Sequence, residues 1–155
     1  MTPPMPPLPA GATRLTLRLF VGLREDGYFF SAGRHVKKLR QRNPEPRAML
    51  HTQTALESGI KDGDWMYIEI DRGRIKMKAQ LRDDIQKDLV GVRHGWWKPE
   101  MNQGTPELCG VWDHSDGVLL SDDPALLDPE QGLPDLRGGR KCRVLPVENL
   151  SEKTE

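Results

Sequence analysis

The sequence lacks the features that mark disulfide-rich, membrane-spanning and nucleic-acid-binding proteins. It holds only two cysteines, Cys109 and Cys142, and they form no CxxC pair, so nothing marks a secreted disulfide scaffold. No apolar run approaches the ~18–20 residues of a membrane span. The first residues also lack the charged and apolar regions of a signal peptide. Lys and Arg together number 23, as do Asp and Glu, so the chain has no surplus positive charge to favour nucleic acid or an anionic membrane as its main partner.

The common catalytic motifs are missing as well. The four histidines (His35, His51, His94 and His114) contain no pair at helical i, i+4 spacing, and HExxH does not occur, so the sequence predicts no metal site made by this chain alone. There is no GxSxG elbow, no P-loop and no GxGxxG. A small hydrolase using Ser31 or an aspartate is therefore a remote reading, and we assign no catalytic residue.

What is present is one body between two polar ends. Residues 1–13 are rich in proline, which stiffens the chain and removes main-chain donors, so we expect a disordered linker and a chain cut from something longer. Residues 149–155 are expected to form a polar tail. Residues 14–148 are then expected to form a single domain.

Within that body, apolar residues alternate with polar ones over several short runs, which is typical of half-buried strands. The segment 65–70 and the segment 74–81 are separated by a short turn, so they are expected to pair as an antiparallel hairpin. Thr54 and Glu57 have the spacing of a capping box at the start of a short helix. Many short strands with one or two small helices predict a mainly β fold, a compact barrel rather than a parallel α/β sheet. The other expected elements are strands or extended pieces at 14–20, 28–30, 49–51, 89–92, 118–120 and 141–147, and helices at 35–41 and 52–58.

One cluster of small and basic residues follows the first expected strand. Gly22 and Gly33 would let a ligand approach the main chain closely, and Arg24, Ser31 and Arg34 could donate hydrogen bonds to phosphate oxygens. The alternative interpretation is a polar loop with surface arginines.

The second suggestive segment is His94-Gly-Trp-Trp97, which directly follows the expected strand 89–92. Paired tryptophans beside a glycine can form a flat wall against a planar ring, with an indole N–H as donor. The alternative is that the tryptophans plug the end of the barrel.

Taken in order, several motifs make the chain resemble the C-terminal dinucleotide-binding domain of the dimethyl sulfoxide reductase family of molybdenum and tungsten oxidoreductases. The segments that carry the resemblance are His51 to Asp64, Ile68 to Ile75, Val92 to Trp97 with its HGWW, Asp128 to Pro134, and Cys142 to Val144. The likeness runs over about Leu15 to Val147. The segments 28–31 and 43–46 look most like the thiosulfate/polysulfide reductase and acetylene hydratase branches.

The resemblance implies a six-stranded double-psi β-barrel that binds molybdopterin guanine dinucleotide, with the Mo or W carried by the cofactor and not by this chain. Cofactors of this kind do the hard chemistry while the protein supplies position and electrostatics. The parent is implied to be a molybdopterin-dependent oxidoreductase, and this domain is expected not to be catalytic alone. The cofactor-binding residues implied by matching family motifs are Gly22, Arg24, Ser31, Arg34, His94, Gly95, Trp96, Gly117 (where relatives have asparagine) and Arg137.

Two readings of function remain open at this point. The first is the cofactor-binding domain, whose partners are the remaining domains or subunits of the parent enzyme, with no nucleic acid, no membrane contact and a monomeric isolated chain. The second is a stand-alone barrel that acts as a protein-interaction module, because fold alone does not fix function.

Overall fold

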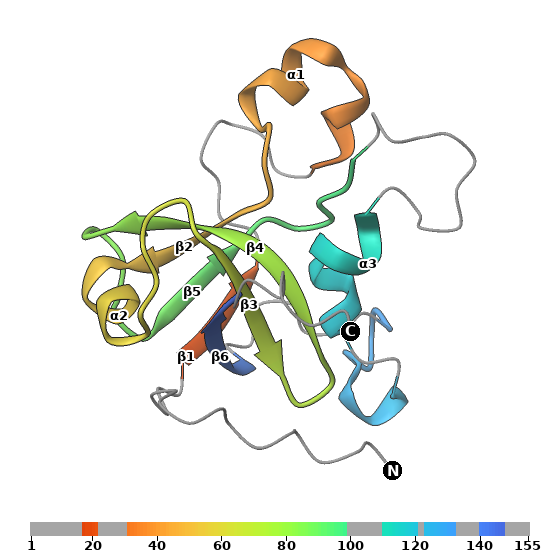
Figure 1. Ribbon diagram of the computed structural model, residues 1–155. Helices are drawn as coiled ribbons and strands as arrows, with labels where there is room; N and C mark the ends of the chain where they lie inside the picture. Colours follow the sequence, from red (N-terminus) through yellow and green to blue (C-terminus); the bar gives the residue numbers. More distant parts are fainter. Residues whose placement is uncertain (1–16, 22–30, 99–109, 121–122, 133–139, 148–155) are drawn as a thin grey trace, which may run out of the picture.

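The computed structural model of the 155-residue chain describes residues 17–21, 31–98, 110–120, 123–132 and 140–147. The expected linker at 1–13, the tail at 149–155 and the extended piece at 28–30 lie outside these residues. Six strands account for most of the regular structure (Figure 1). They are β1 Leu17–Val21, β2 Arg47–His51, β3 Trp65–Ile70, β4 Gly73–Arg82, β5 Leu89–Val92 and β6 Arg140–Pro146.

The six strands close into a barrel in the order β1-β5-β2-β4-β3-β6. The pairs β1/β5 and β2/β4 are parallel, and the other four pairs are antiparallel. This confirms the mainly β, six-stranded barrel. The expected hairpin is confirmed too, because Ile68 pairs with Ile75 and Met66 with Met77 across β3 and β4.

The interior of the barrel is filled by the apolar residues that alternate along the strands. Ile68, Met66 and Met77 are fully buried, as are Leu50 and Val90 on the neighbouring strands. Outward positions of the same strands carry polar and aromatic side chains. The period-two pattern of the sequence therefore defines the inner and outer faces of the wall.

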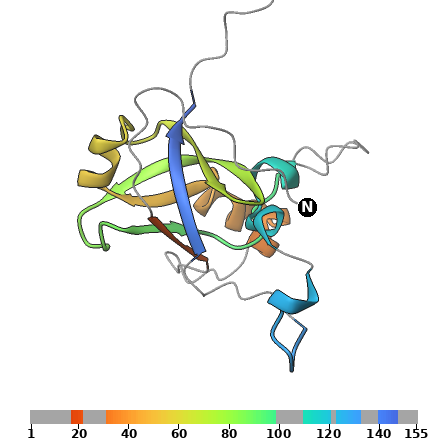
Figure 2. The same ribbon diagram turned by 90° about the horizontal axis from the view of Figure 1, so that it is seen from below.

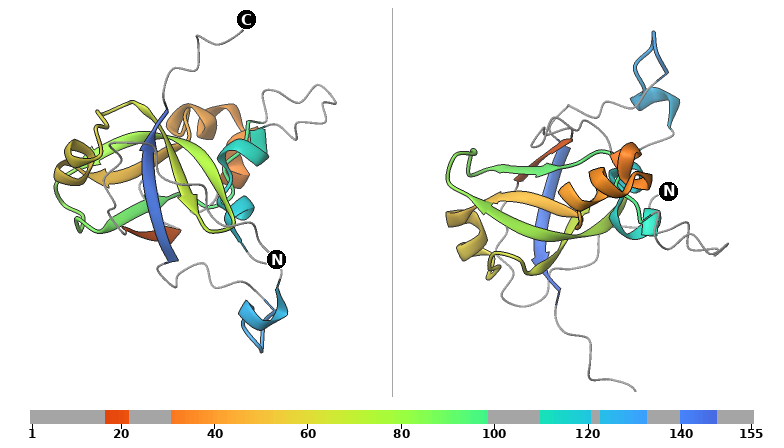
Figure 3. Two further views of the ribbon diagram at one scale, coloured as in Figure 1. Left: turned by 60° about the horizontal axis from the view of Figure 1, so that its bottom comes forward. Right: turned by 90° about the horizontal axis from the view of Figure 1, so that it is seen from above.

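Short helices lie at the two ends of the barrel. They are η1 Ser31–His35, α1 Lys37–Arg42, α2 Thr52–Glu57, α3 Val111–His114, η4 Asp116–Leu119 and η5 Pro124–Leu126. Figures 2 and 3 place α2 at one end, whereas η1, α1 and α3 gather near the other. No helix in the described ranges is long and apolar enough to cross a membrane.

Two local expectations are wrong. The helix after β2 is present, but its cap is His51, whose Nδ1 accepts from the Gln53 amide at 3.0 Å. Thr54 is instead buried and donates from Oγ1 to the Lys87 carbonyl at 2.5 Å, because tertiary contact outweighs the local capping pattern. The expected strand at 118–120 is replaced by the 3-10 helix η4, which buries Leu119 in the core and packs Val118 against it.

Candidate functional site

The loop that leaves β5 is the centre of the candidate site, and we call residues 93–98 the post-β5 loop. Its turn depends on Gly95, whose φ of +65° lies in the left-handed region that residues with a Cβ rarely adopt. Two hydrogen bonds from this turn meet one carboxylate. Asp116 Oδ1 accepts from the Gly95 amide at 2.7 Å, and Asp116 Oδ2 lies 2.7 Å from His94 Nδ1.

The partners differ strongly in exposure. Asp116 is 0% exposed, whereas the His94 side chain is 31% exposed. A buried carboxylate is costly unless it is hydrogen-bonded, so the two donors of the turn satisfy Asp116. The carboxylate in turn fixes the position of a ring that reaches the surface.

Trp96 forms the buried wall of the same loop. It is 1% exposed, and its ring packs edge-to-face with the His114 ring at a centroid distance of 5.4 Å. On another side the guanidinium carbon of Arg34 lies 4.1 Å from the Trp96 ring centroid. The Trp96 indole Nε1 is buried without a hydrogen-bond acceptor among the described residues.

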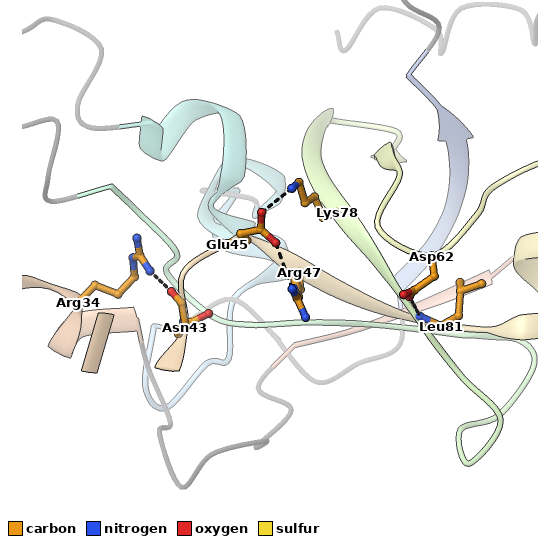
Figure 4. A network of polar contacts seen from close by, with 7 residues as sticks. All are labelled: Arg34, Asn43, Glu45, Arg47, Asp62, Lys78 and Leu81. Atoms are coloured by element: carbon orange, nitrogen blue, oxygen red, sulfur yellow. Dashed lines mark hydrogen bonds and ion pairs between the residues drawn. The ribbon is translucent and has the colours of Figure 1, made fainter. Parts of the chain in front are cut away.

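Arg34 comes from η1 and ties three segments together. Its Nε donates to the Trp97 carbonyl at 2.6 Å, and its Nη1 donates to the Asn43 carbonyl after α1 (Figure 4). Its own carbonyl accepts from Arg40 at 3.1 Å. The Arg34 side chain is 0% exposed, so this arginine supports the post-β5 loop from inside and is not a surface arginine.

A second polar cluster lies beside this one on the wall of the barrel. Glu45 is ion-paired with Lys78 of β4 and with Arg47 of β2, the latter at 3.1 Å (Figure 4). These cations hold the pKa of the Glu45 carboxyl below its usual range, with the hydrogen bond from Lys78 as the largest cause. The cluster fixes the chain between α1 and β2, directly after Asn43.

The structure brings together most of the predicted site residues that it describes. Arg34 and Trp96 are in contact, His94 and Gly95 share Asp116, and Gly117 follows Asp116 in η4. Gly117 donates its amide to Ser115 Oγ at 3.2 Å, and a Cβ at this position would lie 3.3 Å from that oxygen. Ser31 begins η1. Gly22, Arg24 and Arg137 lie outside the described residues, so their predicted contacts stay predictions.

A hollow of about 380 Å³ on the outer face of β3 and β4 was not predicted. Its walls carry aromatic and basic side chains: Trp65, Tyr67, Arg74, Lys76, Lys98, Trp112, Asp113 and His114. Within it, Arg74 lies over the Tyr67 ring at 4.3 Å and Lys76 over the Trp65 ring at 5.1 Å. The sequence does carry a signal for this hollow, because the outward positions of the β3–β4 hairpin are aromatic or basic and alternate with the core residues.

His114 connects the hollow to the post-β5 loop. Its ring stacks on Trp65 at 5.8 Å on one side and touches Trp96 on the other. Burial lowers the pKa of His114, outweighing the opposite effect of its hydrogen bond to the Lys76 carbonyl. The ring is therefore neutral near pH 7 and donates from Nδ1 to that carbonyl at 2.6 Å.

Comparison with known proteins places this geometry in a family. The model of the Molydopterin dinucleotide binding domain matches residues 19–114. Acetylene hydratase of Syntrophotalea acetylenica is 41% identical over 133 residues, which is 84% of this chain and 18% of that protein. The chain belongs to the molybdopterin dinucleotide-binding domain family.

Further relatives agree with this assignment. Dopamine dehydroxylase of Eggerthella lenta is 34% identical over 75% of this domain and 11% of its own length. The solved structure of acetylene hydratase from Pelobacter acetylenicus superposes with a TM-score of 0.75 at 39% identity, covering 85% of this chain and 18% of that one. This chain thus spans less than a fifth of the length of these relatives. These comparisons do not support the interaction-module reading.

The residues present fit the cofactor of this family, a molybdopterin dinucleotide with its Mo or W. A dinucleotide offers many hydrogen-bond acceptors and fused planar rings, and the site offers a buried indole N–H without an acceptor in the described part of the chain. The described residues include no group of three His, Cys, Asp or Glu side chains that could hold a metal ion.

Proposed function

We propose that this molybdopterin-binding domain closes one side of the cofactor site of a larger Mo or W enzyme through the post-β5 loop and the segments next to it. The proposed contact residues are Gly22, Arg24, Ser31, Arg34, His94, Gly95, Trp96, Gly117 and Arg137. The observation that carries the proposal is the post-β5 loop itself, which the buried Arg34 and Asp116 hold in one conformation.

The contact residues have different tasks in this proposal. His94 and the Gly95 turn face the cofactor, Trp96 forms the wall behind them, and Arg34 acts by supporting that wall in addition to its predicted contact. When bound, the cofactor supplies the metal and its chemistry. This domain supplies a preformed surface, which reduces the ordering cost of binding.

The test is a titration of the isotope-labelled chain with GDP, a mimic of the nucleotide end of the cofactor, followed by amide NMR shifts. We expect saturable shifts at His94 to Trp96 and at Gly117. Inorganic pyrophosphate separates a phosphate contact from a contact to the base. No saturable shift at millimolar GDP would overturn the assignment of a nucleotide contact to these residues.

Two variants locate the binding. His94→Ala is expected to weaken GDP binding, whereas Trp112→Ala, which removes an exposed ring from the hollow, is expected to leave it unchanged. The opposite pattern would place GDP in the hollow on β3 and β4 and would contradict the proposed site.

We propose further that the partners of this domain are the remaining domains or subunits of the parent enzyme and that the isolated chain is monomeric and binds no nucleic acid. The short coverage of the relatives and the balanced charge support this. Size-exclusion chromatography with light scattering should give a mass near 17.6 kDa for the isolated chain. A stable dimer would contradict the monomeric state.

A further inference from the structure

The hollow on the outer face of β3 and β4 carries more positive than negative charge. Three basic side chains line it, those of Arg74, Lys76 and Lys98, against the single carboxylate of Asp113. Burial lowers the pKa of His114, so this ring adds no positive charge near pH 7. The hollow therefore has a formal surplus of two positive charges.

Several basic residues elsewhere on the barrel strands are neutralised by ion pairs, whereas those of the hollow are not. The paired residues are Lys78 with Glu45, Arg82 with Asp84, and Arg143 with Glu69. Arg74, Lys76 and Lys98 form no ion pair with any carboxylate in the part of the chain that the structure describes. Their positive charge is therefore available to an anionic group.

The cations of the hollow are held in place by their neighbours. Arg74 and Lys76 lie over the rings of aromatic residues on β3. The stem of Lys98 packs against the main chain at Gly110, where a Cβ would lie 3.4 Å from Lys98 Cδ. Trp112 of α3 lines the same hollow and is 60% exposed. The hollow thus offers fixed cations and an open aromatic side chain to a segment that carries carboxylates.

The segment that follows β6 carries the complementary charge. Residues 148–155, which we call the post-β6 segment, lie outside the described residues and hold three glutamates and one lysine, a formal surplus of two negative charges. Their attachment point lies next to the hollow, because the amide of the preceding residue, Val147, donates to the carbonyl of Trp65 at 3.0 Å, and Trp65 lines the hollow. Eight residues can span up to about 26–29 Å, which is ample for a hollow of about 380 Å³.

We propose that the post-β6 segment docks into the hollow on β3 and β4 and pairs its glutamates with Arg74, Lys76 and Lys98. Each exposed ion pair of this kind is weak and is screened by salt. Attachment to β6 offsets this weakness, because a short tether gives the segment an effective concentration on the order of millimolar at the hollow. A millimolar Kd for the free segment is therefore enough to fill the hollow about half of the time. The hollow is separate from the proposed cofactor contacts, so this inference can be tested independently of the proposed function.

The test compares NMR spectra of the full chain with those of a chain that ends at Val147. The reporter is the indole N–H of Trp112, because Trp112 lies on α3 and not on a strand next to the removed residues. Signals of Trp65 are less suitable, since its carbonyl accepts directly from Val147. We expect the Trp112 signal to shift on shortening at about 0.01 M NaCl. A synthetic peptide of residues 148–155, added to the shortened chain at millimolar concentration, should return the signal toward its position in the full chain.

Variants of full length separate the charge of the segment from its mere presence. Replacing Glu148, Glu152 and Glu155 together by glutamine should reproduce most of the shift seen on shortening. The matched control is Lys153→Gln, which removes the positive charge of the same segment and should keep the signal of the full chain. Raising NaCl from about 0.01 M to about 1 M reduces the Debye length from ~30 Å to ~3 Å. The Trp112 signals of the full and shortened chains should therefore coincide at high salt.

Three results would overturn the inference. The first is an unchanged Trp112 signal on shortening, which would leave the hollow to another part of a parent enzyme. The second is a shift on shortening that the triple glutamine variant does not reproduce, because docking through carboxylates requires it. The third is a Trp112 signal in the full chain that moves to the shortened-chain position on dilution, which would assign the hollow to a second copy of the chain.

Discussion

Replacing Arg34 with alanine should destabilise the whole domain, although the sequence suggests a residue that acts only on a ligand. The side chain is fully buried, and its removal leaves the carbonyls of Trp97 and Asn43 without these donors. Each buried acceptor left unpaired costs about 1–3 kcal/mol. Losing the contact with the Trp96 face adds about 1–2 kcal/mol. We expect the free energy of unfolding to fall by about 3–8 kcal/mol, a large part of the ~5–15 kcal/mol of a typical domain.

The assay is urea unfolding followed by tryptophan fluorescence, with Arg34→Lys and Arg18→Ala beside Arg34→Ala. Lysine keeps the charge but cannot donate in two fixed directions, so Arg34→Lys should fall between the wild type and Arg34→Ala. Arg18 is a surface partner of Asp88, and its removal should hardly move the midpoint. A loss below about 1 kcal/mol for Arg34→Ala would refute the structural role assigned to the buried guanidinium.

Three other perturbations test the core and its titrating groups. Ile68→Asp puts a charge among fully buried residues and should lower the free energy of unfolding by more than about 4 kcal/mol. The control Leu56→Asp, at a position that is 73% exposed, should be nearly neutral. A native-like thermal melt of Ile68→Asp would contradict the assigned core face. Because burial lowers the pKa of His114, the unfolded chain binds its proton first, so unfolding free energy should fall as pH drops below about 6.5, and His114→Gln should flatten that slope. The same pH dependence in His114→Gln and in the wild type would contradict the assigned role of His114. Burial raises the pKa of Cys142 to about 12, so its thiol should resist alkylation by iodoacetamide at about pH 8 until urea unfolds the chain. Mass spectrometry of the peptide that contains Cys142 reports the alkylation, and rapid modification of the native chain would contradict the burial of this thiol.

The strands and the hairpin could be predicted because their information is local, whereas the six-stranded closure joins distant strands such as β1 and β5 and was implied only by the family resemblance. Strands β3 and β4 alternate apolar and polar residues, and the short connection between them fixes their register. Where a local pattern competed with a tertiary contact, the tertiary contact won. Thr54 has the spacing of a cap but donates to the carbonyl of Lys87, 33 positions away. The 118–120 segment lies in and after a 3-10 helix that places Leu119 in the core and Val118 against it.

The supporting residues of the site could not be predicted for the same reason. Arg34 has the local surroundings of a phosphate-binding arginine, and its burial depends on a carbonyl 63 positions away. Asp116 directly precedes Gly117, a residue that the resemblance implies as a contact, but its own contact with His94 joins two segments whose approach no spacing rule encodes. The proposed contact residues His94, Gly95 and Trp96 were easier to single out, because histidine, glycine and tryptophan together form an unusual local string.

Arg34 and Asp116 carry opposite charges, and each forms hydrogen bonds with the main chain of the post-β5 loop. Arg34 binds the carbonyl of Trp97 at the end of the loop, and Asp116 binds the amide of Gly95 and the ring of His94 near its start. Elsewhere in the domain two buried charges neutralise each other directly: Glu69 of β3 and Arg143 of β6 form an ion pair at 2.9 Å. Burying a charged side chain to hold the main chain lowers the stability of the domain. It also leaves the post-β5 loop with little conformational entropy to lose when a ligand binds. If this is the purpose of the arrangement, weakening either group should lower ligand affinity even where the ligand touches neither of them.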